Sequence, residues 1–258
     1  MAREVRKLSL KERRRRGLII KASLALFLCI VSLCGVAYVT RIPSVTVSRI
    51  TVAGVSAIPQ EKIQEVVENA LQGSYAFIVP KRMSFVVPEE KIRKSVLAAF
   101  PHIDSVRITK PDMQTVQVSV TERTLHAVWC NERCYGMDKN GYIFSDFTGS
   151  TTVRTYRGGI QDGPLRATFL PGSFTELDSF LERVGTASKR RIIEADIHDD
   201  GDVFCTFQDG GGIRFTRSSQ NDDLLNSVAS VFASQRFSGS VPFEYVDFRF
   251  DGNKALVK

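Results

Sequence analysis

The residues best suited to metal or covalent chemistry lie in one short run, in which His126, Cys130 and Cys134 are spaced four apart. Imidazole and thiolate groups bind zinc, but a structural zinc site takes four ligands and no fourth is evident nearby. The two cysteines instead flank a three-residue turn, where opposed hairpin positions approach the Cβ separation of a disulfide. The run therefore favours a hairpin disulfide, as in an oxidising compartment, with zinc as the alternative.

The other polar motifs indicate turns and a core. Neither His102 nor His198 belongs to a metalloprotease or nucleophile-elbow motif. Asp138–Gly141 and Asp199–Asp202 resemble the start of a calcium loop but lack its later glutamate, so we predict tight turns. Cys205 lies in an apolar run typical of a buried strand. We predict no enzyme, no cofactor and no metal. A carboxylate pair assembled from distant strands would not be visible in the sequence, so an anchored cell-wall-modifying enzyme is kept as an alternative.

The N-terminal 40 residues combine a basic segment with an uncharged apolar one. Residues 1–17 carry eight Arg and Lys against two Glu, and no charge occurs between Lys21 and Arg41. A helix over 22–39 would be about 27 Å long, close to the thickness of a bilayer core. The pattern predicts a cytoplasmic tail at 1–17 and a transmembrane helix at 18–40, which contains Cys29 and Cys34, with the rest outside. A signal peptide cleaved after residues 35–37 is the rival interpretation.

The charge balance of the remainder argues against nucleic-acid binding. The chain has 35 basic and 28 acidic residues, and without the nine basic and two acidic residues of positions 1–21 it carries 26 of each sign. The sequence pI of about 9.3 therefore reflects the N-terminal segment. A protein that reads a duplex is expected to keep its positive charge on the folded domain.

The rest of the chain has the pattern of two domains and an α+β fold. Residues 44–123 read as strand, helix, helix, strand, strand, with helical apolar spacing after residue 60 and after residue 88 and a hairpin near the end. Residues 124–258 read as short strands joined by turns, interrupted by helices near 174–185 and 221–232. We therefore predict a mainly antiparallel β-domain with two helices after the first domain.

Five local motifs, in chain order, resemble those of the bacterial division family FtsQ, called DivIB in some lineages. The family motifs are I-x-V-x-G, compared with residues 50–54, a P-x-[VI] turn with 100–103, E-R-x-P-x-A-x-W with 122–129, D-x-[DN]-G-x-[VI]-F with 138–144, and Y-[IV]-D-L-R-[YF] with 245–250. The sequence departs from the family at Leu125, where proline is usual, at His102, where an aromatic residue is common, and in the cysteine pair.

The resemblance implies a function and a set of partners. It implies a POTRA domain at 44–123, which would dock other divisome proteins. It also implies a noncatalytic bitopic scaffold in the bacterial plasma membrane, single-pass and enriched at the division septum, that links single-span division proteins to septal peptidoglycan synthesis. A POTRA-bearing component of a secretion or outer-membrane pathway is the alternative.

The resemblance places the docking site for FtsB, in its complex with FtsL, in the C-terminal region. The last strand has no successor in the chain, which predicts a sheet edge able to accept a partner strand. The matching residues are Phe250, Gly252, Ala255, Leu256, Val257 and Lys258.

Overall fold

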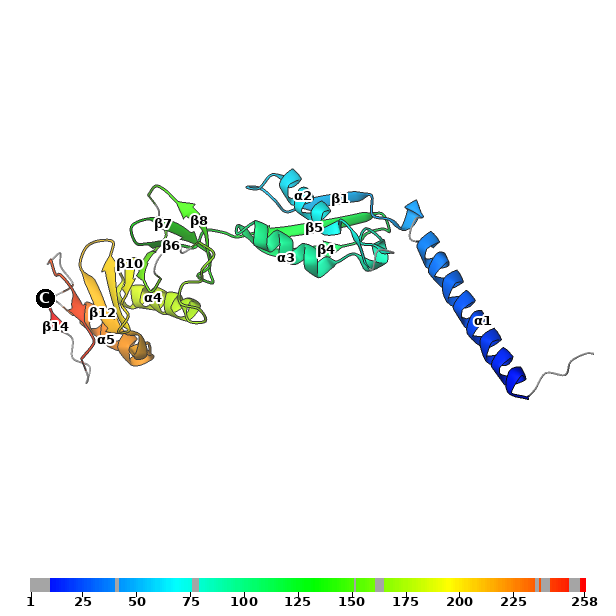
Figure 1. Ribbon diagram of the computed structural model, residues 1–258. Coiled ribbons are helices and arrows are strands. Elements are labelled where there is room, and N and C mark those ends of the chain that lie inside the picture. The colour runs from blue at the N-terminus through cyan, green and yellow to red at the C-terminus, as the bar shows by residue number, and fades with distance from the viewer. Residues whose placement is uncertain are drawn as a thin grey trace, which may run out of the picture. The chain divides into compact units, whose positions relative to one another are not determined.

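The computed structural model describes residues 10–39, 42–75, 79–150, 152–160, 165–234, 237, 242–250 and 256–258. The chain divides into two compact units, Met1–Thr121 and Glu122–Lys258. Figure 1 shows the elements of each unit.

The first helix corrects the predicted membrane topology. α1 runs from Leu10 to Val39, so the basic residues Arg15, Arg16 and Lys21 lie within the same helix as the apolar segment. In the described part of the chain, no helix has both the length and the apolar character that crossing a membrane requires. The predicted span at 18–40 is therefore wrong, and so is the predicted single-pass location in the plasma membrane. The basic residues predicted to form a separate tail at 1–17 continue from Leu10 into the same helix as the apolar segment.

The first unit packs two helices on a small mixed sheet. Its elements are η1 (Pro43–Val45), β1 (Arg49–Ala53), α2 (Gln60–Leu71), β2 (Ser74–Tyr75), β3 (Val79–Pro80), η2 (Ser84–Val86), α3 (Glu89–Ala99), β4 (Ile103–Thr109) and β5 (Thr115–Glu122). The sheet order is β1-β5-β4, with β1 parallel to β5, while β2 and β3 form a separate hairpin. Ile63 and Val67 of α2 and Ile92 of α3 are fully buried against sheet residues such as Val116 and Val118.

The second unit is built on one nine-stranded sheet. Its elements are β6 (Ala127–Cys130), β7 (Cys134–Met137), β8 (Ile143–Phe147), β9 (Thr155–Gly158), α4 (Phe174–Ser188), β10 (Ile192–Ile197), β11 (Asp202–Phe207), β12 (Gly212–Thr216), η3 (Arg217–Ser219), α5 (Asp222–Phe232), β13 (Val246–Asp247) and β14 (Leu256–Val257). The strand order is β14-β13-β12-β11-β10-β9-β6-β7-β8.

The predicted POTRA domain followed by a mainly antiparallel β-domain is wrong as a fold description. The sheet is mixed, because β9 is parallel to both β6 and β10, and β12 is parallel to β13. The helices near 174–185 and 221–232, expected as interruptions of a meander, are crossovers: α4 connects β9 to β10, and α5 connects β12 to β13. A helical crossover is what allows successive strands to pair in parallel. The first unit also contains the β2–β3 hairpin, which the expected element order lacks.

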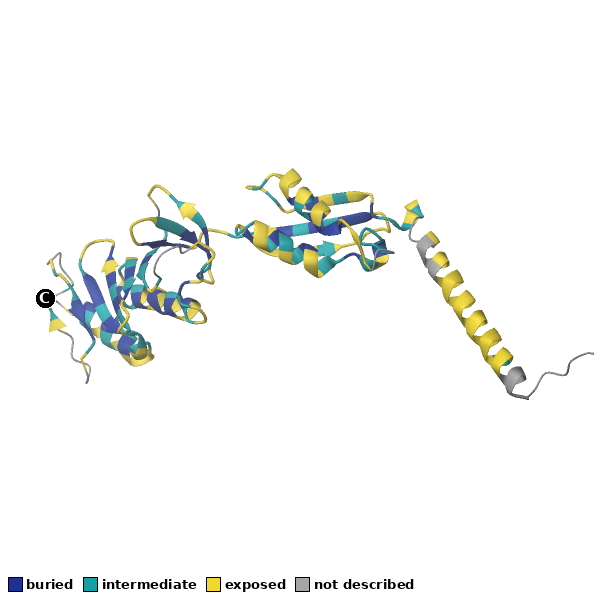
Figure 2. Ribbon diagram, in the orientation of Figure 1, coloured by how far each residue is buried: buried dark blue, intermediate teal, exposed yellow. Residues whose placement is uncertain are grey.

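The two faces of the nine-stranded sheet differ. Helices α4 and α5 lie on one face, where Phe180, Leu181 and Val228 pack against strand residues such as Val203 and Phe215 (Figures 1 and 2). Side chains alternate along a strand, so the next residues point to the other face. There the register aligns Asp196, Phe204, Arg214, Asp247 and Leu256 across β10 to β14. We call this row and its neighbours the outer face.

Candidate functional site

Four of the six predicted docking residues are described by the structure, and they lie near the end of the nine-stranded sheet. Phe250 and Leu256 expose 53% and 56% of their surface, whereas Val257 is half-buried and packs against the core. Lys258 is exposed and forms an ion pair with Glu244. Gly252 and Ala255 lie outside the described residues.

β14 presents backbone groups away from the sheet. Lys258 accepts a hydrogen bond from the Glu244 amide at 2.7 Å and donates one to the Tyr245 carbonyl at 3.1 Å. The backbone N–H and C=O of Lys258 therefore both point toward residues 244–245. Because successive residues of an antiparallel strand direct their N–H and C=O groups alternately to the two sides, those of Val257 point outward.

The opposite edge of the sheet is covered where it begins. β8 is the last strand there, and its Ile143 donates to the Ala167 carbonyl at 2.9 Å and accepts from the Arg166 amide at 2.8 Å. β14 is the outermost strand at its end of the sheet, and no described segment forms backbone hydrogen bonds with its outer side. β14 is therefore an edge at which an added strand would meet unpaired backbone.

An arginine clamp fixes the segment that leads to this edge. Arg249 Nη2 donates to Asp247 Oδ2 at 2.6 Å, and its Nη1 donates to Asp202 Oδ2 at 2.5 Å. Burial alone would raise the pKa of Asp247, but the hydrogen bonds and charge of Arg249 hold it below its usual value. The Asp-x-Arg part of the sequence motif at 245–250 is thus a structural contact within the unit.

Beside the clamp, cationic and aromatic side chains stack across the outer face. The guanidinium of Arg214 lies between two rings, 4.5 Å from the centroid of Phe204 and 3.5 Å from that of Tyr245. Lys258 Nζ is 5.9 Å from the Tyr245 ring. A hollow of about 210 Å³ is lined by Phe204, Arg214, Glu244 and Tyr245, among others. The edge strand therefore borders a rigid polar and aromatic surface.

The cysteine and turn motifs have structural roles. Cys130 and Cys134 form a disulfide across the β6–β7 hairpin, with Cα atoms 4.1 Å apart, and His126 contacts a different element. In the loop at 138–141, the Asp138 carboxylate accepts from the amides of Asn140 and Tyr142 at 2.8 and 3.0 Å. Gly141 has φ +78°, and a Cβ there would come within 2.7 Å of the Phe169 carbonyl, so the turn requires glycine.

A second candidate site lies where three parallel strands begin. Strands β6, β9 and β10 lie side by side in the sheet. The residue just before each of them is His126, Arg154 and Arg191, respectively. Together with α4 they border a cleft of about 650 Å³. The polar residues of this cleft were not singled out from the sequence, except for His126. The signal that could have found them is the pair Asp178 and Glu182, spaced four apart on one face of a predicted helix.

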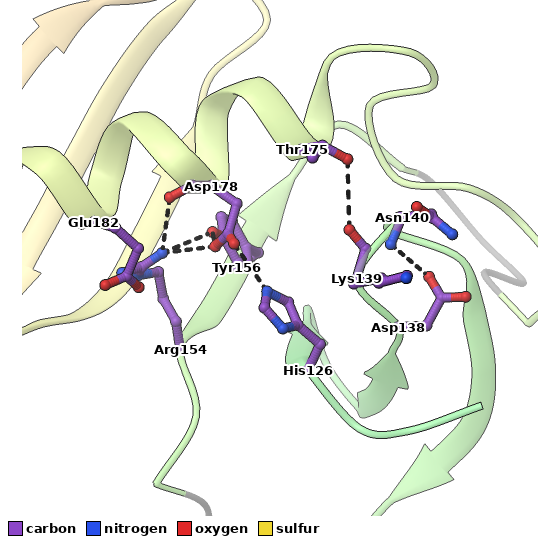
Figure 3. A network of polar contacts seen from close by, with 9 residues as sticks. All are labelled: His126, Asp138, Lys139, Asn140, Arg154, Tyr156, Thr175, Asp178 and Glu182. Carbon is purple, nitrogen blue, oxygen red and sulfur yellow. Dashed lines mark hydrogen bonds and ion pairs between the residues drawn. The ribbon is translucent and has the colours of Figure 1, made fainter. Parts of the chain in front are cut away.

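One carboxylate organises the cleft (Figure 3). Asp178 accepts from Tyr156 Oη at 2.5 Å, from Arg154 Nη1 at 2.7 Å and contacts His126 Nε2 at 2.8 Å. Burial by itself would raise the pKa of Asp178, but hydrogen bonds from Tyr156 and His126 and the charge of Arg154 bring it below its usual value. Burial also raises the pKa of Tyr156. Asp178 is therefore a permanent anion, and Tyr156 a permanent donor, near neutral pH.

The cleft combines cationic side chains with one pair of residues, His126 and Asp178, that can exchange a proton. His126 and Asp178 form a pair of the kind that activates a nucleophile, but no serine or cysteine is among the described residues that border the cleft. Tyr156 is fully buried, and burial, with the nearby charge of Asp178, raises its pKa and keeps its hydroxyl protonated. The cationic side chains of the cleft suit recognition of a negatively charged ligand.

Comparison with protein-family models and with curated protein sequences gave no match to this chain.

Proposed function

We propose that this protein is a noncatalytic scaffold of bacterial cell division, in keeping with its resemblance to the FtsQ/DivIB family, and that it recruits a partner by strand addition at β14. The observation that carries the proposal is the position of β14, which ends the nine-stranded sheet with the backbone of Val257 turned outward. Unpaired strand groups of this kind accept an extended segment from another chain.

The surroundings of β14 favour a specific partner over indiscriminate pairing. Phe250 and Leu256 are large, exposed apolar side chains near the edge, which suits them as anchors for side chains of an added strand. Lys258 and Glu244 add one charge of each sign. Backbone pairing would supply affinity, and these side chains would select the sequence that pairs.

The resemblance suggests the occupant. In the family it resembles, the C-terminal region docks FtsB in its complex with FtsL, both of which are single-span coiled-coil proteins. A partner of this class would present an extended segment beyond its coiled coil. The scaffold would thereby bring such proteins, and the septal peptidoglycan synthesis that depends on them, to the division site.

Deletion of residues 255–258 tests the proposal. The purified protein should bind an FtsB/FtsL-like coiled coil, and the deletion should abolish binding while circular dichroism stays unchanged. Phe250→Ala should weaken binding by about 1–2 kcal/mol, which is roughly 5- to 30-fold. Phe85→Ala, which removes an exposed phenylalanine in the other unit, is the matched control and should bind normally. A folded deletion variant that binds as tightly as the parent would refute the proposal.

A further inference from the structure

The cleft between α4 and the starts of β9 and β10 has an excess of positive charge. Arg154, Lys189, Arg190 and Arg191 border it, against the carboxylates of Asp178 and Glu182. Arg190 is paired with Asp209 at 2.6 Å. The ammonium of Lys189 makes no ion pair within the described residues, and Arg191 donates to the carbonyl of Thr152. Two exposed cations thus remain without a carboxylate partner in this part of the structure.

The guanidinium of Arg154 has one donor unused. Its Nη1 donates to Asp178 at 2.7 Å and its Nη2 donates to Glu182 at 2.6 Å, yet its Nε has no hydrogen-bond acceptor. The Nε atom is itself buried, and a buried donor without an acceptor costs free energy. Nε and Nη2 form the side-on fork of a guanidinium, which fits both oxygens of one carboxylate. In this protein Glu182 occupies half of that fork.

Glu182 is held much less firmly than Asp178. Its side chain is 71% exposed, whereas that of Asp178 is 15% exposed and has two further partners, Tyr156 and His126. An exposed ion pair contributes little free energy, so another carboxylate can exchange with Glu182 at small cost. A ligand carboxylate that reaches both Nε and Nη2 would satisfy the donor that Glu182 leaves unpaired.

We propose that this cleft binds an acidic peptide segment of a partner protein, one carboxylate of which displaces Glu182 from Arg154 while others pair with Lys189 and Arg191. The site is separate from the β14 edge and does not depend on strand addition there. Glu182 acts as an internal competitor that the partner must displace. Binding therefore requires a ligand with several carboxylates.

The composition of the cleft selects a peptide over a phosphate group. Asp178 stays ionised in the wall and repels any anion, but it repels the higher charge of a phosphate more strongly than that of a single carboxylate. The cations are contributed by separate positions along α4 and the strand starts, which suits carboxylates spaced along a chain. Backbone amides of a peptide can also donate to the carboxylates of the cleft, which phosphate oxygens cannot.

Binding of a fluorescein-labelled peptide of alternating glutamate and alanine, followed by fluorescence anisotropy, tests the proposal. Lys189→Gln and Arg191→Gln should each weaken binding by about two- to fivefold. Arg183→Gln, on the same helix but paired with Asp222 outside the cleft, is the matched control and should leave the affinity unchanged.

The decisive variant is Glu182→Ala, for which we expect an affinity about two- to fivefold higher than that of the parent. Glu176→Ala makes the same charge change on α4 away from the cleft and should have no such effect. A misfolded protein would not gain affinity, so the increase separates binding from damage. Unchanged or reduced affinity in Glu182→Ala would overturn the proposal.

Two further arms identify the ligand and separate this site from the edge strand. A peptide with lysine in place of glutamate should not bind, and pyrophosphate that competes as strongly as the glutamate peptide would overturn the assignment to a peptide. Deleting residues 255–258 should leave the affinity for the glutamate peptide unchanged. Loss of peptide binding in that deletion variant would contradict an independent cleft site.

Discussion

Replacing Asp178 by alanine should destabilise the second unit far more than replacing Glu182, although both carboxylates bind the same guanidinium. The two contacts to Arg154 have nearly equal lengths, 2.7 and 2.6 Å, so distance does not distinguish them. Burial does, because Asp178 is 15% and Glu182 is 71% exposed. Asp178→Ala leaves a buried arginine short of a counter-ion and a buried Tyr156 hydroxyl short of its acceptor, at a cost of about 3–5 kcal/mol. Glu182→Ala removes an exposed pair, at a cost of under about 1 kcal/mol.

Denaturant unfolding monitored by tryptophan fluorescence measures this difference directly. Trp129 is the single tryptophan of the chain and lies buried in β6, where its Nε1 donates to the Gly158 carbonyl at 2.9 Å. The signal therefore reports on the second unit alone. Equal losses of unfolding free energy in the two variants would refute the argument that burial, and not the ion-pair distance, sets the strength of these contacts.

Three other properties follow from the same contacts. The pKa of Asp178 in the folded protein lies below its unfolded value of about 3.9, so its contribution to stability is complete above that pH and is lost as the pH falls through the folded pKa. Asp178→Asn should therefore flatten the acid limb of a plot of unfolding free energy against pH. A curve parallel to that of the parent would contradict this. Burial raises the pKa of Cys205 to about 12, so iodoacetamide should leave it unmodified in the folded protein and label it only after unfolding, which mass spectrometry can check against the exposed Cys29. Reducing the Cys130–Cys134 disulfide should cost only about 1–2 kcal/mol because the closed loop is short, and a double serine variant that fails to fold would show a larger role.

Local features of the fold followed from sequence where short-range rules decide them. Apolar spacing identified α2, α3, α4 and α5, because a helix that covers a sheet repeats its buried residues every three or four positions. The turn at 138–141 could be predicted because glycine adopts the positive φ that Gly141 has, and because an aspartate side chain, here that of Asp138, accepts hydrogen bonds from nearby backbone amides. Such signals are contained within a few residues of the element itself.

Strand direction and site assembly did not follow from the sequence. Whether β9 pairs in parallel with β10 depends on where α4 returns the chain, and a strand's own sequence does not record that path. The cleft shows the same limit, because Arg154 and Asp178 meet only after the crossover forms. The interpretation of residues 18–40 as a membrane span was wrong as well, and the helix begins at Leu10, within the segment predicted to be a separate tail.

The most direct test of the docking account is a proline at position 257. Val257→Pro removes the one backbone N–H that we place on the outward side of β14, while it keeps a side chain of similar volume. Val257→Ala keeps that N–H and removes more of the side chain. Measured by calorimetry against an FtsB/FtsL-like coiled coil, with circular dichroism as the folding control, the account predicts that the proline variant loses binding and the alanine variant retains it. A folded proline variant that binds as tightly as the alanine variant would contradict strand addition at this edge.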